Sequence, residues 1–355
     1  MVNDAAPLDR APARSSIRDF AIALLTMMTV LVGGDGMFRD SRFSRSVDRG
    51  SWMPVKRALL AKSGADIVVV GSSVIAEGMS PTAVSARLLE RTGKTFKVFN
   101  GGVSAGGFAA DFLTADTVLE IPREARPKYF VVSFSPTEFS CCPQLEIASD
   151  TKWANTLRLP DLLPLLSAAP TFEEGANDLV LTAFRLLAIR PNVIAMITEL
   201  TPAPPVATWP ADGGGGGIPP VDASTQDFRA RHRAESFKSM MLKPKTVDRV
   251  TPRAYLTRMV SRLRAGGVKV AFIGNPQAPQ MAVLDGPDSI YPEFEVYLRE
   301  LAASMNVSFT SMREMEGVTA SDFVDGDHLD RNGSVKFSNK LADEVLLKLI
   351  ADPAP

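Results

Sequence analysis

The sequence predicts an α/β fold: a doubly wound parallel sheet with helices on both faces and a helical insertion. Two observations support this prediction. Short, continuous apolar runs such as IVVV at 67–70 are typical of strands that are buried on both faces. These runs alternate along the chain with segments in which apolar residues recur at helical spacing. With 355 residues, 45% of them hydrophobic, the chain is long enough to bury a large core.

The predicted elements follow one another in strand–helix order. Ser80 followed by Pro81 predicts the N-terminus of a helix whose buried face consists of Val84, Leu88 and Leu89. The expected strands are 66–70, 96–100, 128–135, 266–275 and 306–312. The other expected helices are 105–120, 253–264, 291–305 and 332–350, the last with Val335 among its buried residues.

A long insertion, residues 141–250, separates the third expected strand from the fourth. Its first half is apolar with a helical pattern, so this half is predicted to be helical. Its second half contains several prolines and five consecutive glycines, and we expect 201–224 to be a flexible loop that does not pack. The basic run that follows, residues 228–245, is expected to be a solvated face; the alternative is that it contacts an anionic ligand or lipid.

The N-terminal part of the chain predicts a membrane anchor. Its apolar run begins at Phe20 and is short for a spanning helix, which needs about 20 residues. The helix could extend to Phe38 if Asp35 reaches the membrane interface. We expect an uncleaved, single-pass anchor in the inner membrane and a periplasmic, extracytoplasmic main domain; an amphipathic or merely buried first helix is the alternative. The predicted order is an N-terminal tail (1–16), the anchor (17–38), a lead-in or stalk (39–64) and the main domain (65–350).

Composition argues against several classes of function. A net charge of −1 provides no electrostatic footprint for nucleic acid. The two cysteines, Cys141 and Cys142, are adjacent, and the two histidines, His232 and His328, are far apart, so the spacing of a zinc site is missing. The glycine turn at 100–107 lacks the G-x-G-x-x-G pattern of a dinucleotide site. We therefore expect no metal, no cofactor and no nucleic-acid partner.

Three residues carry the candidate chemistry. Ser73 lies in a Gly-Ser-Ser turn directly after the first expected strand, and ligands of such sheets bind at the carboxyl ends of strands. Asp325 and His328 lie just before the last expected helix. A serine nucleophile needs a neutral imidazole to take its proton, and the imidazole needs a carboxylate on its other nitrogen to fix the tautomer. The alternative is that His328 and Asp327 cap the last helix.

Taken in order, these turns resemble the motifs of the SGNH/GDSL hydrolase superfamily. Ser73 stands at the position of the family's serine, with Ser72 where the family usually has aspartate. Asp325 and His328 match its Asp-x-x-His motif, and Gly333 matches the glycine that follows. The resemblance implies that Ser73, His328 and Asp325 form a catalytic triad, and that the sheet has the flavodoxin-like arrangement.

The resemblance also implies an oxyanion hole. Its expected donors are the backbone N–H of Ser73, Gly102 and a residue after the third strand. The family has an asparagine there, whereas this chain has Thr137, and losing one such donor can cost about 3–4 kcal/mol of barrier. The departure puts efficient hydrolysis in doubt unless the Thr137 hydroxyl substitutes. Asp327 and His232 are expected to be bystanders.

Together with the anchor and the insertion, the motifs are similar to those of envelope O-acyltransferases and esterases, such as alginate O-acetyltransferases and the D-alanyl transfer proteins of teichoic acids. The expected function is serine-dependent acyl transfer or ester hydrolysis through an acyl-Ser73 intermediate, with O-acyl (acetyl) transfer to an exported polysaccharide favoured. The resemblance implies a membrane-bound O-acyltransferase as partner. A simple carboxylesterase or lipase-like hydrolase and a non-catalytic glycan-binding or partner-binding protein are the alternatives.

Overall fold

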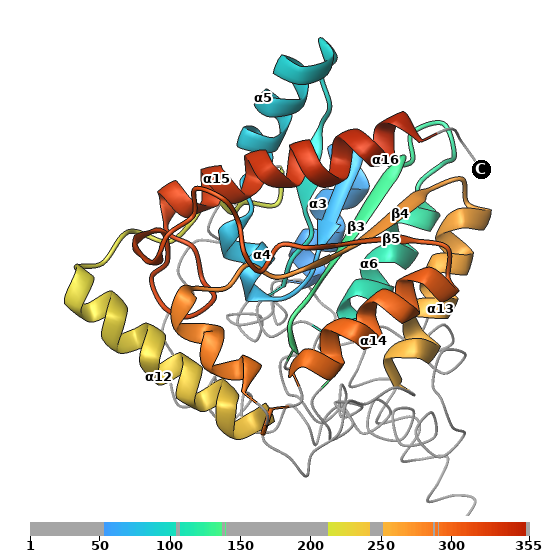
Figure 1. The fold of residues 1–355 in the computed structure, drawn as a ribbon. Coiled ribbons are helices and arrows are strands. Elements are labelled where there is room, and N and C mark those ends of the chain that lie inside the picture. Colours follow the sequence, from blue (N-terminus) through green and yellow to red (C-terminus); the bar gives the residue numbers. More distant parts are fainter. Residues whose placement is uncertain are drawn as a thin grey trace, which may run out of the picture.

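The computed structural model describes residues 53–103, 107–136, 139, 212–241, 251–286, 288–289 and 291–352. Within these ranges, five parallel strands form one sheet in the order β2-β1-β3-β4-β5 (Figure 1). The chain starts inside the sheet and winds outward in both directions, as in flavodoxin-like doubly wound folds. The predicted α/β fold is confirmed.

Each strand lies within a segment that the sequence predicts to be a strand. The β-branched run of β1 is buried at every position, as is β3, because both strands are covered on two faces. β1 pairs in parallel with both neighbours, so that Ile67 lies opposite Val98 and Tyr129. The carboxyl ends of the central strands therefore meet at one edge of the sheet. The strands are β1 (Ile67–Val70), β2 (Val98–Asn100), β3 (Tyr129–Phe134), β4 (Lys269–Gly274) and β5 (Ser308–Ser311).

Helices cover the sheet on both faces, each over its own hydrophobic core (Figure 1). Fully burying one large apolar side chain in such a core stabilises the fold by about 1.5–3 kcal/mol. One core receives side chains from α3 (Met53–Ser63), α6 (Phe108–Glu120), α13 (Thr251–Ala265) and α14 (Tyr291–Ser304). The other receives side chains from α4 (Ser73–Gly78), α5 (Pro81–Thr92), α15 (Arg331–Leu341) and α16 (Leu347–Ala351).

The predicted start of α5 is confirmed. The Ser80 hydroxyl accepts a hydrogen bond from the Ala83 N–H, and Pro81 is the first helical residue. Leu88 is fully buried, but Leu89 is 46% exposed, so the prediction that both face the core was wrong. Adjacent residues lie about 100° apart around a helix, and the narrow face of α5 admits only one of them.

The last predicted helix is interrupted by a π-helical turn, Ala342–Leu346, between α15 and α16. Asp330 caps its start, because its carboxylate accepts a 2.8 Å hydrogen bond from the Gly333 N–H. Val335 is 46% exposed rather than buried. The buried face of α15 runs through Ser334, Phe337 and Leu341 and turns Val335 toward solvent.

Residues 212–218, here called the glycine segment, form a packed part of the fold. The sequence predicts them as part of a flexible loop that does not pack. Instead, the Asp212 carbonyl accepts a hydrogen bond from the Asn100 N–H, and the Ile218 N–H donates to the Leu329 carbonyl. A Cβ added at Gly215 would overlap the Met79 carbonyl, so this close approach requires glycine. The glycine run thus permits backbone-to-backbone packing, which composition alone does not reveal.

The described part of the insertion continues from this segment into α12 (Ala223–Met241), a helix over the basic run. Among the ranges given above, no helix has both the length and the apolarity to cross a membrane. The predicted anchor, 17–38, lies outside the described residues, as does the first half of the insertion.

Candidate active site

Ser73 lies at the carboxyl edge of the sheet, as the first residue of α4. The chain turns sharply between β1 and this helix at Gly71, whose φ is +149°. A Cβ at Gly71 would lie 3.0 Å from both the Cβ and the carbonyl oxygen of Ser133 in β3. Glycine is therefore needed where the turn passes close to the neighbouring strand. This turn places Ser73 where ligands of doubly wound sheets bind.

Asp325 and His328 lie in the loop that precedes α15. The loop is closed by a hydrogen bond from the Val324 N–H to the His328 carbonyl. Oδ1 of Asp325 accepts the backbone N–H groups of Asp327 at 3.0 Å and of His328 at 2.8 Å, which fixes the carboxylate within the turn. The Gly326 carbonyl accepts the Ala278 N–H, so the segment after β4 also holds the loop.

The structure brings Ser73, His328 and Asp325 into one hydrogen-bonded chain, although 255 positions separate Ser73 from His328. Nε2 of His328 lies 2.8 Å from the Ser73 hydroxyl oxygen. Nδ1 of the same ring lies 2.9 Å from Oδ2 of Asp325 and 3.2 Å from its Oδ1. With a proton on Nδ1 donated to the carboxylate, Nε2 is left as the acceptor for the serine hydroxyl. These are the contacts that general-base activation of a serine requires.

The capping alternative for His328 and Asp327 does not fit the structure. The cap of α15 is Asp330, two positions later. His328 is instead largely enclosed, with 13% of its side chain exposed. His232, the other histidine, lies on the exposed side of α12 and stacks on Phe228.

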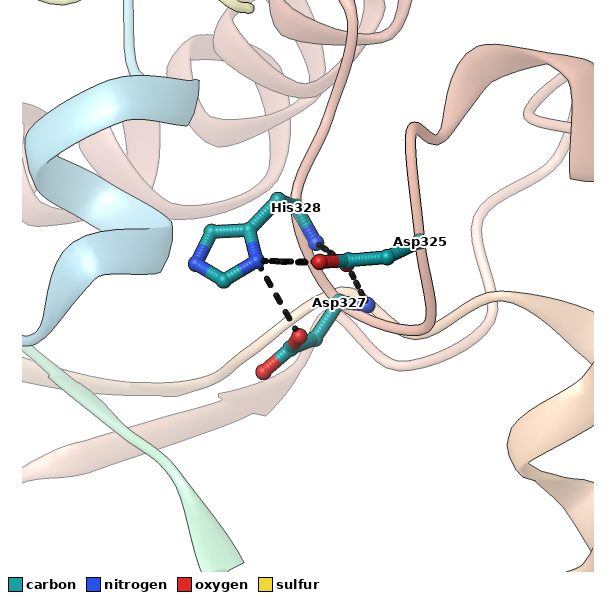
Figure 2. Close-up of side chains that lie close together, drawn as sticks. All are labelled: Asp325, Asp327 and His328. Carbon is teal, nitrogen blue, oxygen red and sulfur yellow. Dashed lines mark hydrogen bonds and ion pairs between the residues drawn. The ribbon is translucent and has the colours of Figure 1, made fainter. Parts of the chain in front are cut away.

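Asp327, which the sequence predicts to be a bystander, also contacts the imidazole. Its Oδ1 lies 3.3 Å from Nδ1 of His328, and Figure 2 shows the two carboxylates approaching the same ring nitrogen. The Asp327 side chain is buried and paired with Arg233 of α12, at 3.0 Å to Oδ1 and 3.1 Å to Oδ2. No local sequence signal indicates this pair, because 94 positions separate its members.

The surroundings shift the pKa values of Asp325, Asp327 and His328. Burial raises the pKa of Asp325, but hydrogen bonds from His328 and two backbone N–H groups outweigh it, and the net pKa lies well below its usual range. Burial also raises the pKa of Asp327, and the positive charges of His328 and Arg233 only partly offset it. For His328, burial lowers the pKa, whereas Asp325, Asp327 and the more distant Glu77 raise it above its ordinary value.

Oxygen and nitrogen ligand atoms of Asp325, Asp327 and His328 lie within 4.8 Å of one another, a spacing that a metal ion could use. The surrounding contacts do not favour such a site. Arg233 occupies both oxygens of Asp327 and already neutralises its charge, and two backbone N–H groups occupy Oδ1 of Asp325. A cation would have to displace the guanidinium group of Arg233.

Gly102, a predicted oxyanion donor, has its backbone N–H engaged within the protein. Its N–H donates a 3.0 Å hydrogen bond to Oδ1 of Asn100. A Cβ at Gly102 would overlap the backbone nitrogen of Ala76, so this glycine allows the turn after β2 to pack against α4. Thr137, whose hydroxyl is the predicted side-chain donor, lies outside the described residues. The N–H of Ser73 belongs to the first turn of α4, where N–H groups have no intrahelical acceptor.

Asn100 is a fully buried residue that ties several parts of the site together, and the sequence did not single it out. Its Nδ2 donates to the carbonyls of Ile75 and Met79 in and after α4, at 2.8 and 3.0 Å. Beneath it, Nζ of Lys56 donates a 2.5 Å hydrogen bond to the Gly102 carbonyl. Burial lowers the pKa of Lys56 to about 7, although Asp212 and Glu77 act in the opposite direction.

Comparisons with known proteins add no relative to this description: no protein-family model matches the chain, and no curated protein matches it. The functional interpretation therefore rests on the residues themselves.

Proposed function

We propose that the protein is a serine-dependent acyltransferase or esterase that works through an acyl-Ser73 intermediate. The observation that carries the proposal is the hydrogen-bonded chain from Ser73 through both ring nitrogens of His328 to Asp325. A serine hydroxyl is a weak nucleophile, and an oriented neutral imidazole is the usual means of activating it.

The proposed reaction has two halves. The Ser73 hydroxyl oxygen attacks the carbonyl carbon of an ester while its proton passes to Nε2 of His328. The ester C–O bond breaks, and His328 returns the proton to the departing alcohol. Water or an acceptor hydroxyl then attacks the acyl group and gives its proton to His328, which passes it to Ser73. In each half Asp325 stabilises the imidazolium, and such acid–base assistance contributes about 10²- to 10⁴-fold.

The resemblance to the SGNH/GDSL superfamily supports this reaction class, because Ser73, Asp325, His328 and Gly333 follow its motif order. On the same resemblance we propose that the Ser73 N–H, with Thr137, stabilises the oxyanion. The acceptor would be a hydroxyl of an exported polysaccharide, reached by an extracytoplasmic domain anchored through 17–38, with a membrane-bound O-acyltransferase supplying acyl groups. A simple esterase would use the same residues with water as acceptor.

A second candidate is a non-catalytic protein that uses the site for binding. The engaged N–H of Gly102 favours it, because this removes one of the expected oxyanion donors.

Labelling with a fluorophosphonate separates the two candidates. We expect the full-length protein to react and the modified peptide to carry the label on Ser73. Ser73→Ala should abolish labelling. Ser72→Ala is the matched control, because Ser72 is adjacent and its side chain makes no capping hydrogen bond. An unreactive but folded wild-type protein would favour the binding role, and label retained in Ser73→Ala would reject Ser73 as nucleophile.

A further inference from the structure

Two carboxylates compete for one nitrogen of the His328 ring. Oδ2 of Asp325 lies 2.9 Å from Nδ1, and Oδ1 of Asp327 lies 3.3 Å from it. An Nδ1–H group can donate one well-aligned hydrogen bond, so the two contacts are not equivalent. Whichever carboxylate accepts this hydrogen bond sets the plane of the ring and hence the direction of Nε2 toward Ser73.

Arg233 distinguishes these carboxylates. Its Nε and Nη2 approach both oxygens of Asp327, the paired geometry in which guanidinium and carboxylate groups bind most strongly. Asp325, in contrast, accepts the ring and two backbone N–H groups from its own loop.

The Arg233 side chain is itself held in place. Its guanidinium carbon lies 4.6 Å from the centre of the Phe237 ring, a cation–π contact within α12. Its stem passes Gly326, where an added Cβ would lie 2.9 Å from Cγ of Arg233. The glycine between the two aspartates therefore makes room for the arginine that pairs with one of them.

We propose that Arg233 is a positioning residue of the site: by pairing with Asp327 it reserves the His328 ring for Asp325 and offsets the charge of the second carboxylate. The consequence for catalysis rests on the proposed function, but the electrostatic effect on His328 does not. The proposal also assigns a role to the insertion, since α12 reaches the site through the side chain of Arg233.

The sign of the effect follows from the charged groups that face the ring. Asp325 and Asp327 lie on its own loop, Glu77 acts from α4, and Arg233 acts through Asp327 from α12. Removing the guanidinium group would leave a buried carboxylate beside Nδ1 without its cation. That carboxylate would favour the imidazolium form and draw the ring away from Asp325.

The chain has two histidines, which makes the test direct. Histidine-labelled full-length protein is titrated by NMR, with His232→Gln used to assign the two ring signals. In Arg233→Gln we expect the His328 midpoint to rise by about one pH unit, the usual size of a single charge effect at this range. The double variant Arg233→Gln/Asp327→Asn should return it to the wild-type value or below.

Arg231→Gln is the matched control, because Arg231 lies on the same helix in an exposed pair with Asp227. It should leave the His328 midpoint unchanged. If Arg233→Gln does not fold, Arg233→Lys, which keeps the charge but loses the paired geometry, and Asp327→Asn, which should lower the midpoint, test the same inference. An unchanged midpoint in folded Arg233→Gln or in Asp327→Asn, or a rise that persists in the double variant, would overturn it. Fluorophosphonate reactivity is scored separately, so failure of the proposed function is distinguishable.

Discussion

The N–H of Gly217 donates a 2.6 Å hydrogen bond to the carbonyl of Glu77, in the helix that begins with Ser73. The next residue, Ile218, donates to the carbonyl of Leu329, which directly follows His328. Two consecutive amides therefore join the element that carries the serine to the loop that carries the histidine. The glycine segment thus contributes to the distance between two side chains that it does not contain.

Gly215→Ala tests this role of the glycine segment. Gly215 and Gly216 have nearly the same φ, +108° and +104°, so alanine at either position carries a similar backbone strain of about 1–3 kcal/mol. Only at Gly215 would the added Cβ overlap Met79 and Asn100; at Gly216 it meets nothing within 4 Å. We expect Gly215→Ala to lower the free energy of unfolding more than Gly216→Ala, and to slow fluorophosphonate labelling. Equal losses in urea unfolding and equal labelling rates would show that packing of this segment is unimportant.

The triad residues should act as a unit. If Ser73 is activated only through the imidazole, His328→Ala slows labelling by about 100-fold or more. Adding Asp325→Ala to His328→Ala should then change the rate by less than about tenfold, because Asp325 acts through the ring. The measurement is the second-order labelling rate of both single variants and the double variant. If the rate loss in the double variant equals the product of the losses in the two single variants, Asp325 and His328 contribute independently.

The pH dependence of labelling should report His328. The imidazole must be neutral to accept the serine proton, so the rate should fall as the pH drops through the pKa of His328. Because the neighbouring carboxylates raise that pKa above its ordinary 6.5, the midpoint should lie above 6.5. Asp325→Asn removes one charge and one hydrogen bond, and should move the midpoint downward while lowering the plateau rate. A midpoint below 6.5 in the wild-type protein would contradict this assignment.

Local sequence patterns predicted much of the fold. Short strand-like segments located all five described strands, with a continuous apolar run at β1 and a polar, half-apolar segment at β5. The Ser80–Pro81 pair located a helix start. Each of these signals depends on neighbours in the chain. The side chains of Ser73, Asp325 and His328 were also predicted, since each lies at a recognisable turn, and the structure brings them together. Their catalytic roles stay predictions.

The features that the sequence did not predict depend on contacts between distant segments. The Arg233–Asp327 pair joins a basic run, which was expected to be solvated, to a loop far along the chain. Gly102 was expected to donate to an oxyanion, yet its N–H donates to Asn100, a side chain that the distant carbonyls of Ile75 and Met79 hold in place. The glycine run of the insertion predicted a flexible loop. In the structure, the absence of side chains allows its backbone to pack between Asn100, Met79 and Leu329.

Lys56 should make the stability of the protein depend on pH above neutrality. Its Nζ is buried against the Gly102 carbonyl, and burial lowers its pKa from 10.5 to about 7. Between these two values the unfolded chain binds a proton that the folded protein does not, so the free energy of unfolding should rise as the pH rises from about 7 toward 10.5. One such group can contribute a slope of at most about 1.4 kcal/mol per pH unit.

Lys56→Met should therefore flatten the pH dependence of urea unfolding between pH 7.5 and 9.5. Lys62→Met, at an exposed position of the same helix, is the control and should keep the wild-type slope. If both variants keep that slope, Lys56 is not the group responsible, and its ammonium is stabilised in the folded state as well as it is in water.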